Sequence, residues 1–186
     1  LTENTAGEDG GALRLNRVDD IQVVGNLLCA NAASGDDGGA AWAGSSGSVQ
    51  HVWTHNAVVQ NTALDRAGGV YFFQTSPAVV RNNSFLANGA PRSGQLYSSA
   101  TLLNFDSNLV AHDTADNAID TSSTSPWTGA DLVYTVFFDN LDDVSSDLEP
   151  SGVGNVVGDP ILTDVSLDGV CGDDRFAPGS GSALVD

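Results

Sequence analysis

An asparagine returns about once every 27 residues in this sequence, each time at the end of a short apolar run. A fixed period of this size is typical of a solenoid, in which each repeat forms one coil and stacks on the next. Asn4 fits the end of a further copy, 27 residues before Asn31. Five segments carry the full pattern, and their starts lie 30, 27, 25 and 27 residues apart: Asn26–Asn31, Asn56–Asn61, Asn83–Asn88, Asn108–Asp113 and Thr135–Asn140.

The residues that lead up to each repeat motif alternate between apolar and mixed types, which is the period of a half-buried β-strand. In addition, the positions two and three residues after the first motif residue are apolar in all five copies. Helical spacing does not fit, and the glycine and β-branched content further disfavours helix. The position three residues before each motif is always apolar: Val23, Trp53, Val80, Phe105 and Leu132.

A glycine pair opens a second strand in three copies, at Gly10-Gly11, Gly38-Gly39 and Gly68-Gly69, and Gly94 stands at the same place in the fourth. Paired glycines permit backbone conformations closed to other residues, and they let neighbouring coils approach closely at a corner. Each coil is therefore predicted to run strand, sharp corner, strand, bend, strand.

Stacked coils bring like residues above one another, so the recurring asparagines are predicted to form a hydrogen-bonded ladder along the axis. The predicted fold is all-β: a right-handed, single-stranded parallel β-helix of six to seven coils. Residues 1–160 form the coils and 161–186 a terminal coil or capping segment. A leucine-rich repeat is the rival architecture. The predicted ladder residues are Asn4, Asn31, Asn61, Asn88 and Asn140, with Asp113 as the exception.

The glycine-pair motif Gly10-Gly-Ala-Leu13 and the motif Phe85-Leu-Ala-Asn88 resemble the right-handed parallel β-helix repeats of bacterial surface proteins, including the chlamydial polymorphic outer-membrane proteins. The C-terminal segment, with Gly158-Asp-Pro160 and Ala177-Pro-Gly-Ser180, is similar to an ending common in secreted bacterial β-helix proteins. This chain departs from that ending at Gly181, where the pattern has proline. The resemblance implies the fold and a surface context and leaves activity open.

The charge is strongly acidic, with 24 Asp and Glu against six basic residues, all of them arginine, and a formal net charge of -18. Such a charge repels nucleic acid and anionic membranes, and it suits cation binding, high salt or solubility. No apolar stretch is long enough to cross a bilayer. Because the chain starts inside a repeat, we expect it to be a fragment of a longer protein or a mature piece without leader and anchor.

The two cysteines, Cys29 and Cys171, are about five coils apart in the repeat register. Coils rise by about 4.8 Å each, which would separate the two by about 24 Å, too far for a disulfide. The sequence therefore predicts two separate thiols.

Enzymes that act on polysaccharides are the second functional class considered, since hydrolases need converging carboxylates and a lyase would use an arginine base with Ca²⁺. The weak candidates are Arg81, Asp106 and Asp131, in neighbouring coils. For calcium, the candidates are acidic residues of the terminal segment, because clustered hard oxygen ligands suit this ion: Asp164, Asp168, Asp173 and Asp174.

Other side chains are predicted to have structural roles. His51 occupies an inward column and is expected to be packed and hydrogen-bonded rather than a metal ligand. Trp42, Tyr71 and Tyr97 follow the glycines at nearly equal offsets and are expected to stack in one column, whose direction the sequence leaves open.

Together these features favour a non-catalytic secreted or surface-exposed β-helix that acts as a stalk, adhesin or filament segment. Its expected partners are copies of itself, other surface proteins or polysaccharide, without nucleic acid. No cofactor is required, and calcium is the candidate ion. A polysaccharide lyase or hydrolase and a phage-type receptor-binding spike are the alternatives.

Overall fold

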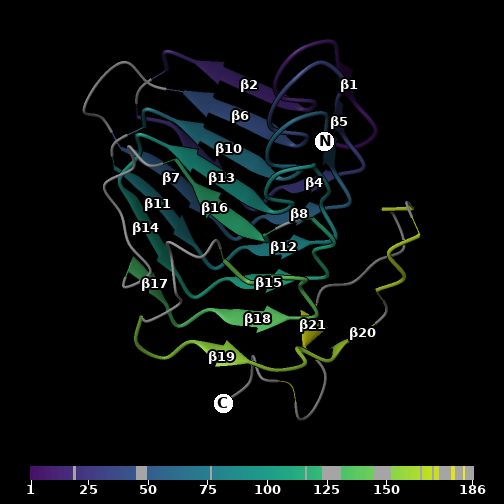
Figure 1. The fold of residues 1–186 in the computed structure, drawn as a ribbon, viewed down its shortest axis with the longest axis vertical. Coiled ribbons are helices and arrows are strands. Elements are labelled where there is room, and N and C mark those ends of the chain that lie inside the picture. The colour runs from purple at the N-terminus through teal and green to yellow at the C-terminus, as the bar shows by residue number, and fades with distance from the viewer. Residues whose placement is uncertain are drawn as a thin grey trace.

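The computed structural model describes residues 1–18, 20–44, 50–75, 77–115, 117–122, 131–144, 152–163, 165–168, 170–171, 177–178 and 182. Over these residues the chain winds into a parallel β-solenoid, whose coils stack along the long axis of the molecule (Figure 1). No α-helix occurs among the described residues, and none of them belongs to a helix long and apolar enough to cross a membrane. The predicted fold class is therefore confirmed.

Three long sheets form the walls of the solenoid, and every strand pair within them is parallel. One contains β2 (Leu13–Asn16), β6 (Ala41–Gly44), β10 (Val70–Phe73), β13 (Leu96–Ser99) and β16 (Ile119–Thr121). The second contains β3 (Gln22–Val24), β7 (His51–Thr54), β11 (Ala78–Arg81), β14 (Leu103–Asp106) and β17 (Leu132–Val133). The third contains β4 (Leu27–Cys29), β8 (Ala57–Val59), β12 (Ser84–Leu86), β15 (Leu109–Ala111), β18 (Val136–Phe138) and β19 (Val156–Val157).

Two smaller sheets complete the described structure. β1 (Thr5–Ala6), β5 (Ala32–Ala33) and β9 (Thr62–Ala63) pair in parallel, while β20 (Leu162–Thr163) and β21 (Ala177–Pro178) form an antiparallel pair after the last coil. The long sheets hold five, five and six strands, so about four full turns separate the first and last coils. The predicted count of six to seven coils was slightly too high, because the chain leaves the solenoid before its terminal segment.

Apolar side chains at the inward-facing strand positions fill the interior, and each stacks on the equivalent side chain of the neighbouring coil. Trp53, Phe72, Phe85, Phe105 and Phe137 are the largest of these side chains, and each is at most 1% exposed. Their rings meet in edge and stacked geometries, such as Trp53 against Phe72 at 5.6 Å between centroids. The apolar columns read from the sequence thus form one continuous core.

One asparagine ladder runs along the corner after the third sheet. The side-chain amide of Asn31 donates to Asn61 Oδ1 at 2.8 Å, and that of Asn61 donates to Asn88 Oδ1 at 2.8 Å. Asn4 joins the exposed end by donating to Asn31. Each Oδ1 in this ladder also accepts the backbone N–H of the residue stacked on it. Because Asn31, Asn61 and Asn88 are at most 1% exposed, these bonds replace those that water would make.

A second ladder, which was not predicted separately from the first, uses the asparagine that begins each of the first four motifs. Asn26 donates to Asn56, Asn56 to Asn83 and Asn83 to Asn108, with N–O distances of 2.9 to 3.1 Å. The two ladders lie before and after the third sheet, so each coil is pinned to the next at both ends of one strand.

Glycine is required where coils touch at the corner before the first sheet. A Cβ placed on Gly39 would overlap the backbone carbonyl oxygens of Gly68 and Thr62, and one on Gly11 would overlap that of Gly39. Gly38 has a φ of +69°, which other L-residues rarely adopt. The glycine pairs therefore act as predicted, by allowing close approach and a sharp turn.

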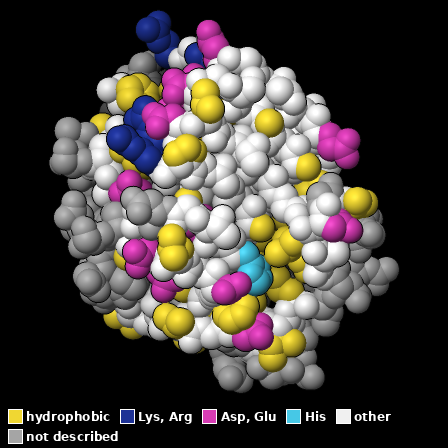
Figure 2. Space-filling view, turned by 45° about the vertical axis from the view of Figure 1, so that its right-hand side comes forward, with side chains coloured by type: hydrophobic (Ala, Val, Ile, Leu, Met, Phe, Trp, Pro, Cys, Tyr) yellow, Lys and Arg dark blue, Asp and Glu magenta, His cyan; other side chains and the backbone are white. Residues whose placement is uncertain are grey.

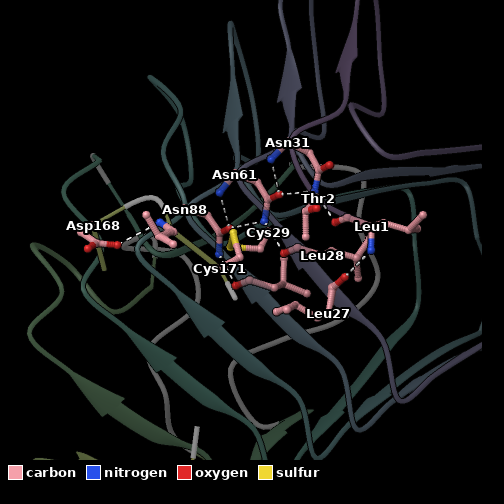
Figure 3. The surroundings of a disulfide bond; sticks show 12 residues. Leu1, Thr2, Leu27, Leu28, Cys29, Asn31, Asn61, Asn88, Asp168 and Cys171 are labelled. Atoms are coloured by element: carbon pink, nitrogen blue, oxygen red, sulfur yellow. Dashed lines mark hydrogen bonds between the residues drawn. A yellow bond between two sulfur atoms is a disulfide. The ribbon is translucent and has the colours of Figure 1, made fainter. Parts of the chain in front are cut away.

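The prediction of two separate thiols was wrong. Cys29 in β4 and Cys171 form a disulfide across 142 residues of sequence, with 6.0 Å between their Cα atoms (Figure 3). The estimate of 24 Å assumed that Cys171 continues the stack. Instead, the terminal segment turns back along the outside of the third sheet, where Leu162, Leu167 and Cys171 pack on it.

This packing explains why two neighbouring positions of every motif are apolar. One column, including Leu28, Val58 and Phe85, faces the interior. The next, including Cys29, Val59 and Leu86, faces outward and is buried in the cluster that contains the terminal segment. A sheet covered on both faces needs apolar residues on both, without strict alternation.

Removing a central amide of the ladder is expected to destabilise the fold far more than removing an end one. Asn61→Ala takes away two donors and one acceptor in a buried site, so we expect about 3 kcal/mol loss in the free energy of unfolding, measured by urea denaturation. Asn4→Ala, at the exposed end, is the control and should cost about 1 kcal/mol or less. Equal losses in the two variants would contradict a ladder that depends on burial.

Reduction of the disulfide is expected to lower stability, because the bond closes a loop of more than a hundred residues in the unfolded chain. The loop-entropy relation gives about 5 kcal/mol as an upper value. Thermal unfolding with and without reductant measures the effect, and the double variant Cys29→Ser/Cys171→Ser should match the reduced protein and ignore reductant. A melting temperature unchanged by reductant would overturn the expectation.

Candidate functional site

The first ladder is interrupted in the fourth coil, where the repeat has Asp113 in place of asparagine. Its backbone N–H keeps the regular pattern and donates to Asn140 Oδ1 at 3.0 Å. Its carboxylate is different: the residue is 2% exposed, and neither oxygen has a hydrogen-bond partner among the described residues. Asn140, a predicted ladder residue, therefore accepts a hydrogen bond from the backbone of Asp113. The Asp113 side chain does not connect Asn140 to Asn88, so the side-chain ladder is broken at this coil.

Gln95 occupies the space that the missing amide would fill. It is level with Gly69 of the third coil and Ala40 of the second, which are both small residues. Its Oε1 accepts the side-chain N–H of Asn88 at 2.5 Å, and its Nε2 donates to the backbone carbonyl of Ala111 at 3.2 Å. The fourth coil thus differs at both its glycine corner and its ladder corner. Gln95 accepts the hydrogen bond that Asn88 would otherwise donate to position 113, and the Asp113 carboxylate has no hydrogen-bond partner among the described residues.

Asp113 lies at the wall of an open cavity of about 590 Å³ on the corner between the third sheet and the following loop. The other lining residues come from three neighbouring coils: Ala87, His112, Thr114, Asp139, Asn140 and Leu141. His112 Nδ1 lies 3.0 Å from Asp139 Oδ2, and the His112 ring stands edge-on to Phe138. Figure 2 shows this side of the molecule, where histidine, acidic and hydrophobic side chains meet around a hollow.

The environment of Asp113 changes its acidity. Burial raises the pKa of its carboxyl from the usual 3.8 to about 7, and the nearby backbone N–H of Ala115, although outside hydrogen-bonding geometry, offsets part of this rise. At neutral pH a carboxyl group with this pKa is only partly ionised, so it can accept or release a proton near pH 7.

Asp113→Asn is expected to stabilise the protein at alkaline pH. The folded pKa is raised, so between about pH 4 and pH 7 the unfolded chain gives up a proton that the folded chain keeps, and stability falls as pH rises through this window. Above pH 7 the cost of burying the ionised carboxylate reduces the free energy of unfolding in full, by about 4 kcal/mol as an upper value from the rise in its pKa from 3.8 to about 7. Urea unfolding at pH 4 and pH 8 should show a large gain for the variant only at pH 8.

The double variant Gln95→Gly/Asp113→Asn is the matched control, because it restores the residues of the third coil, Gly69 and Asn88. It should show the same loss of pH dependence. If wild type and Asp113→Asn have parallel stability profiles between pH 4 and pH 8, the carboxyl group does not titrate as described.

A second cluster of acids lies at the glycine corner of the first two coils. Carboxylate oxygens of Asp9, Asp36 and Asp37 lie within 4.8 Å of one another, and this is the one such group of three metal-binding side chains among the described residues. Asp37 is buried, and burial raises its pKa to about 6, although the charge of Arg66 opposes the shift.

Arginines neutralise much of this acidic cluster. Arg66 Nε lies 3.2 Å from Asp37 Oδ1, and Arg14 Nη2 lies 3.1 Å from Asp9 Oδ2. The same arginines cover aromatic rings on the outer face of the first sheet: Arg66 lies 5.5 Å from the centroids of both Tyr71 and Tyr97, and Arg14 5.8 Å from that of Trp42. Counterions within the chain thus already partner two of the three acids, which weakens the case for a bound cation.

These contacts show which way the aromatic column predicted from the sequence faces. Trp42, Tyr71 and Tyr97 stack on adjacent strands, in register, and face away from the interior core. Tyr71 and Tyr97 are nevertheless only 4% and 7% exposed, so they form a small cluster of their own rather than an open platform.

The sequence-predicted catalytic candidates do not form a converging pair of carboxylates. Arg81 and Asp106 oppose each other on β11 and β14, with 2.8 Å between Nε and Oδ2, and so neutralise each other. Asp131 comes directly before β17, and the strand register places Val133 rather than Asp131 beside Asp106.

Among the calcium candidates, Asp164, Asp173 and Asp174 lie outside the described residues. Asp168 is described, and its Oδ1 accepts the backbone N–H of Val170 at 2.9 Å, which is a turn contact. His51 is fully buried and its Nε2 lies 2.7 Å from the carbonyl oxygen of Val18, in agreement with a packed, hydrogen-bonded histidine.

The sequence analysis missed Gln95 and the cavity beside Asp113. Asp113 was predicted to be the one exception in the ladder, and a signal was present in the same coil, because Gln95 stands where the third coil has Gly69. Comparison of the chain with protein-family models, curated proteins and solved structures finds no match. The functional interpretation therefore depends on the geometry and on the sequence itself.

Proposed function

We propose that this chain is a rigid structural segment of an extracellular or surface-exposed protein, which holds its outer faces in a fixed arrangement for contact with partners. The observation that carries the proposal is the Cys29–Cys171 disulfide. Disulfides of this kind form and persist in oxidising compartments, chiefly outside the cell.

Rigidity is the property that the solenoid offers. Coils are joined by three walls of parallel strands, by two ladders of side-chain amides and by a continuous apolar core. The disulfide ties the terminal segment to the first coil, across the outside of the third sheet. The described coils follow one another without a break in the three walls, so the body can transmit force and position along its axis, as a stalk or filament segment requires.

The acidic surface and the repeat motifs agree with this role. A net charge of -18 keeps such a rod soluble and repels nucleic acid. The Gly-Gly-Ala-Leu and Phe-Leu-Ala-Asn motifs resemble those of bacterial surface β-helices, which supports adhesion to other surface proteins, to polysaccharide or to copies of the same chain. Right-handed winding of the coils is part of this proposal. Calcium binding in the terminal segment stays a prediction.

Catalysis on polysaccharides has weaker support. The Arg81–Asp106 ion pair uses up the arginine that a lyase would need as a base, and it leaves no second carboxylate in register. A phage-type spike would require a trimer with a lateral interface.

Surface location is tested by antibody labelling of intact and permeabilised cells of the source, with free thiols blocked at lysis. We expect labelling of intact cells or of the medium, and a protein whose two cysteines are fully disulfide-bonded. A cytosolic protein serves as the control for leakage. Labelling that requires permeabilisation, together with two free thiols, would exclude an extracellular role.

The absence of catalysis is tested on the same purified protein with a panel of acidic and neutral polysaccharides. We expect no unsaturated product in the ultraviolet and no new reducing ends. Light scattering at increasing concentration then distinguishes monomer, filament and trimer. Product formation would replace the structural proposal with an enzymatic one.

A further inference from the structure

One short motif of the sequence is not explained by the repeat. Asn82-Asn83-Ser84 has an asparagine followed two residues later by a serine, which is the acceptor pattern for N-linked glycosylation. No other asparagine in the sequence has serine or threonine at that distance. Because three residues match such a pattern often by chance, the placement of both ends of the motif in the structure decides its meaning.

Asn82 is exposed at the corner between β11 and β12, where its backbone has a φ of +53°. Its carboxamide has one hydrogen-bond partner among the described residues, His55 Nε2, which lies 3.5 Å from Nδ2 at the outer limit of a hydrogen bond. The equivalent residues of the neighbouring coils, His55 and Ser107, are exposed as well. A group attached to Nδ2 can therefore extend into solvent without displacing a buried side chain.

Asn83 has the opposite environment, although it is the next residue. It is 2% exposed, and its Nδ2 donates to Asn108 Oδ1 at 3.1 Å and to the carbonyl oxygen of Trp53 at 2.9 Å. A sugar on this nitrogen would remove one of these protons and interrupt the second ladder. The structure thus separates two adjacent asparagines, one that holds coils together and one that is open to modification.

Ser84 is the other end of the motif, and the fold gives no reason for a serine there. Its hydroxyl has no hydrogen-bond partner among the described residues, and the side chain is half-buried. The strand register aligns it with four residues that are all apolar: Leu27, Ala57, Leu109 and Val136. A hydroxyl at this distance from Asn82 is what the acceptor pattern requires, so glycosylation accounts for the one polar residue of the column.

We propose that Asn82 carries an N-linked glycan and that the Ser84 hydroxyl serves its recognition. The inference rests on the proposed extracellular role, because this acceptor pattern is used in secreted proteins. In the transfer, Asn82 Nδ2 forms a bond to C1 of a sugar held on a lipid phosphate. The bond from C1 to the phosphate oxygen breaks, and the lipid phosphate leaves with that electron pair. Nδ2 gives up one of its two protons to a base of the transferase and keeps the other.

The transfer is expected to precede folding of this coil. The backbone N–H of Asn83 donates to Asn108 Oδ1, and that of Ser84 donates to the carbonyl oxygen of Asn56. These bonds hold the folded motif against its neighbours, so it cannot enter an enzyme as a free segment. Attachment to the unfolded chain agrees with the final structure, because the Asn82 side chain remains exposed.

The test is mass spectrometry of the protein isolated from its source. Chymotrypsin, which cleaves after phenylalanine, releases residues 74–85 between Phe73 and Phe85. We expect this peptide to carry the added mass of one or more sugars, and electron-transfer fragmentation to locate that mass on Asn82. Partial occupancy still supports the proposal, whereas sugar on Asn83 or on the Ser84 oxygen contradicts it.

Two variants made in the source cells separate recognition from structure. Ser84→Ala should lose the added mass completely, and Ser84→Thr should keep it, although neither change touches Asn82. Both should fold, because alanine stands at the equivalent position 57 and threonine favours strands, and their melting curves check this. A merely structural role of Ser84 would not divide the two variants in this way.

The failure of this inference can be distinguished from the failure of the proposed function. A protein that is found outside the cell with its disulfide formed, but with residues 74–85 unmodified, would overturn the glycan alone. A protein retained in the cytosol with free thiols would overturn the extracellular role and the glycan with it. Sugar that persists on Asn82 in Ser84→Ala would exclude recognition through the hydroxyl.

Discussion

The structure depends on the hydrogen bonding of side-chain amides that are removed from water. A carboxamide has both a donor and an acceptor, so a column of asparagines can satisfy itself indefinitely, provided that the coils keep one spacing and one register. Asn56 and Asn61 show the pattern, each bonded to the amides above and below and to a backbone carbonyl. The glycine corners and the inward apolar columns are arranged so that this spacing is kept.

In a repeat of this kind, a residue that differs from its equivalents in the other coils shows where the structure changes. In the fourth coil a carboxylate replaces an amide. It cannot donate to Asn140, and Asn88 donates to Gln95 instead of to Asp113, so the regular chain of bonds stops at Asn88. Gln95 restores the bond to Asn88 only because the glycine of that corner is also replaced. The result is a solenoid whose strands continue past this coil, but in which one buried carboxylate has no hydrogen-bond partner among the described residues. Structural need alone does not account for such a group, because asparagine would serve the ladder better.

The terminal segment has an energetic role of its own. It covers the outer face of the third sheet, which would otherwise present apolar side chains from several coils to water. The disulfide fixes this cover to the first coil, and so joins parts of the chain that the repeat itself keeps apart. Stacking, covering and cross-linking together give a body with no obvious hinge among the described coils, which is why a structural role is the proposal that the geometry favours.

The sequence by itself determined the parallel β-solenoid, the inward columns and the close glycine corners, because each of these repeats with the period of the chain and involves neighbouring coils. It also marked Asp113 as an exception. Tertiary structure alone decided the second amide ladder's contacts, the outward direction of Trp42, Tyr71 and Tyr97, the insertion of Gln95 and the disulfide. Those features depend on where a side chain points or on a segment that leaves the repeat, as Cys171 does. Periodicity fixes the spacing between equivalent residues, whereas the path of a non-repeating segment is set by the surface that it can bury.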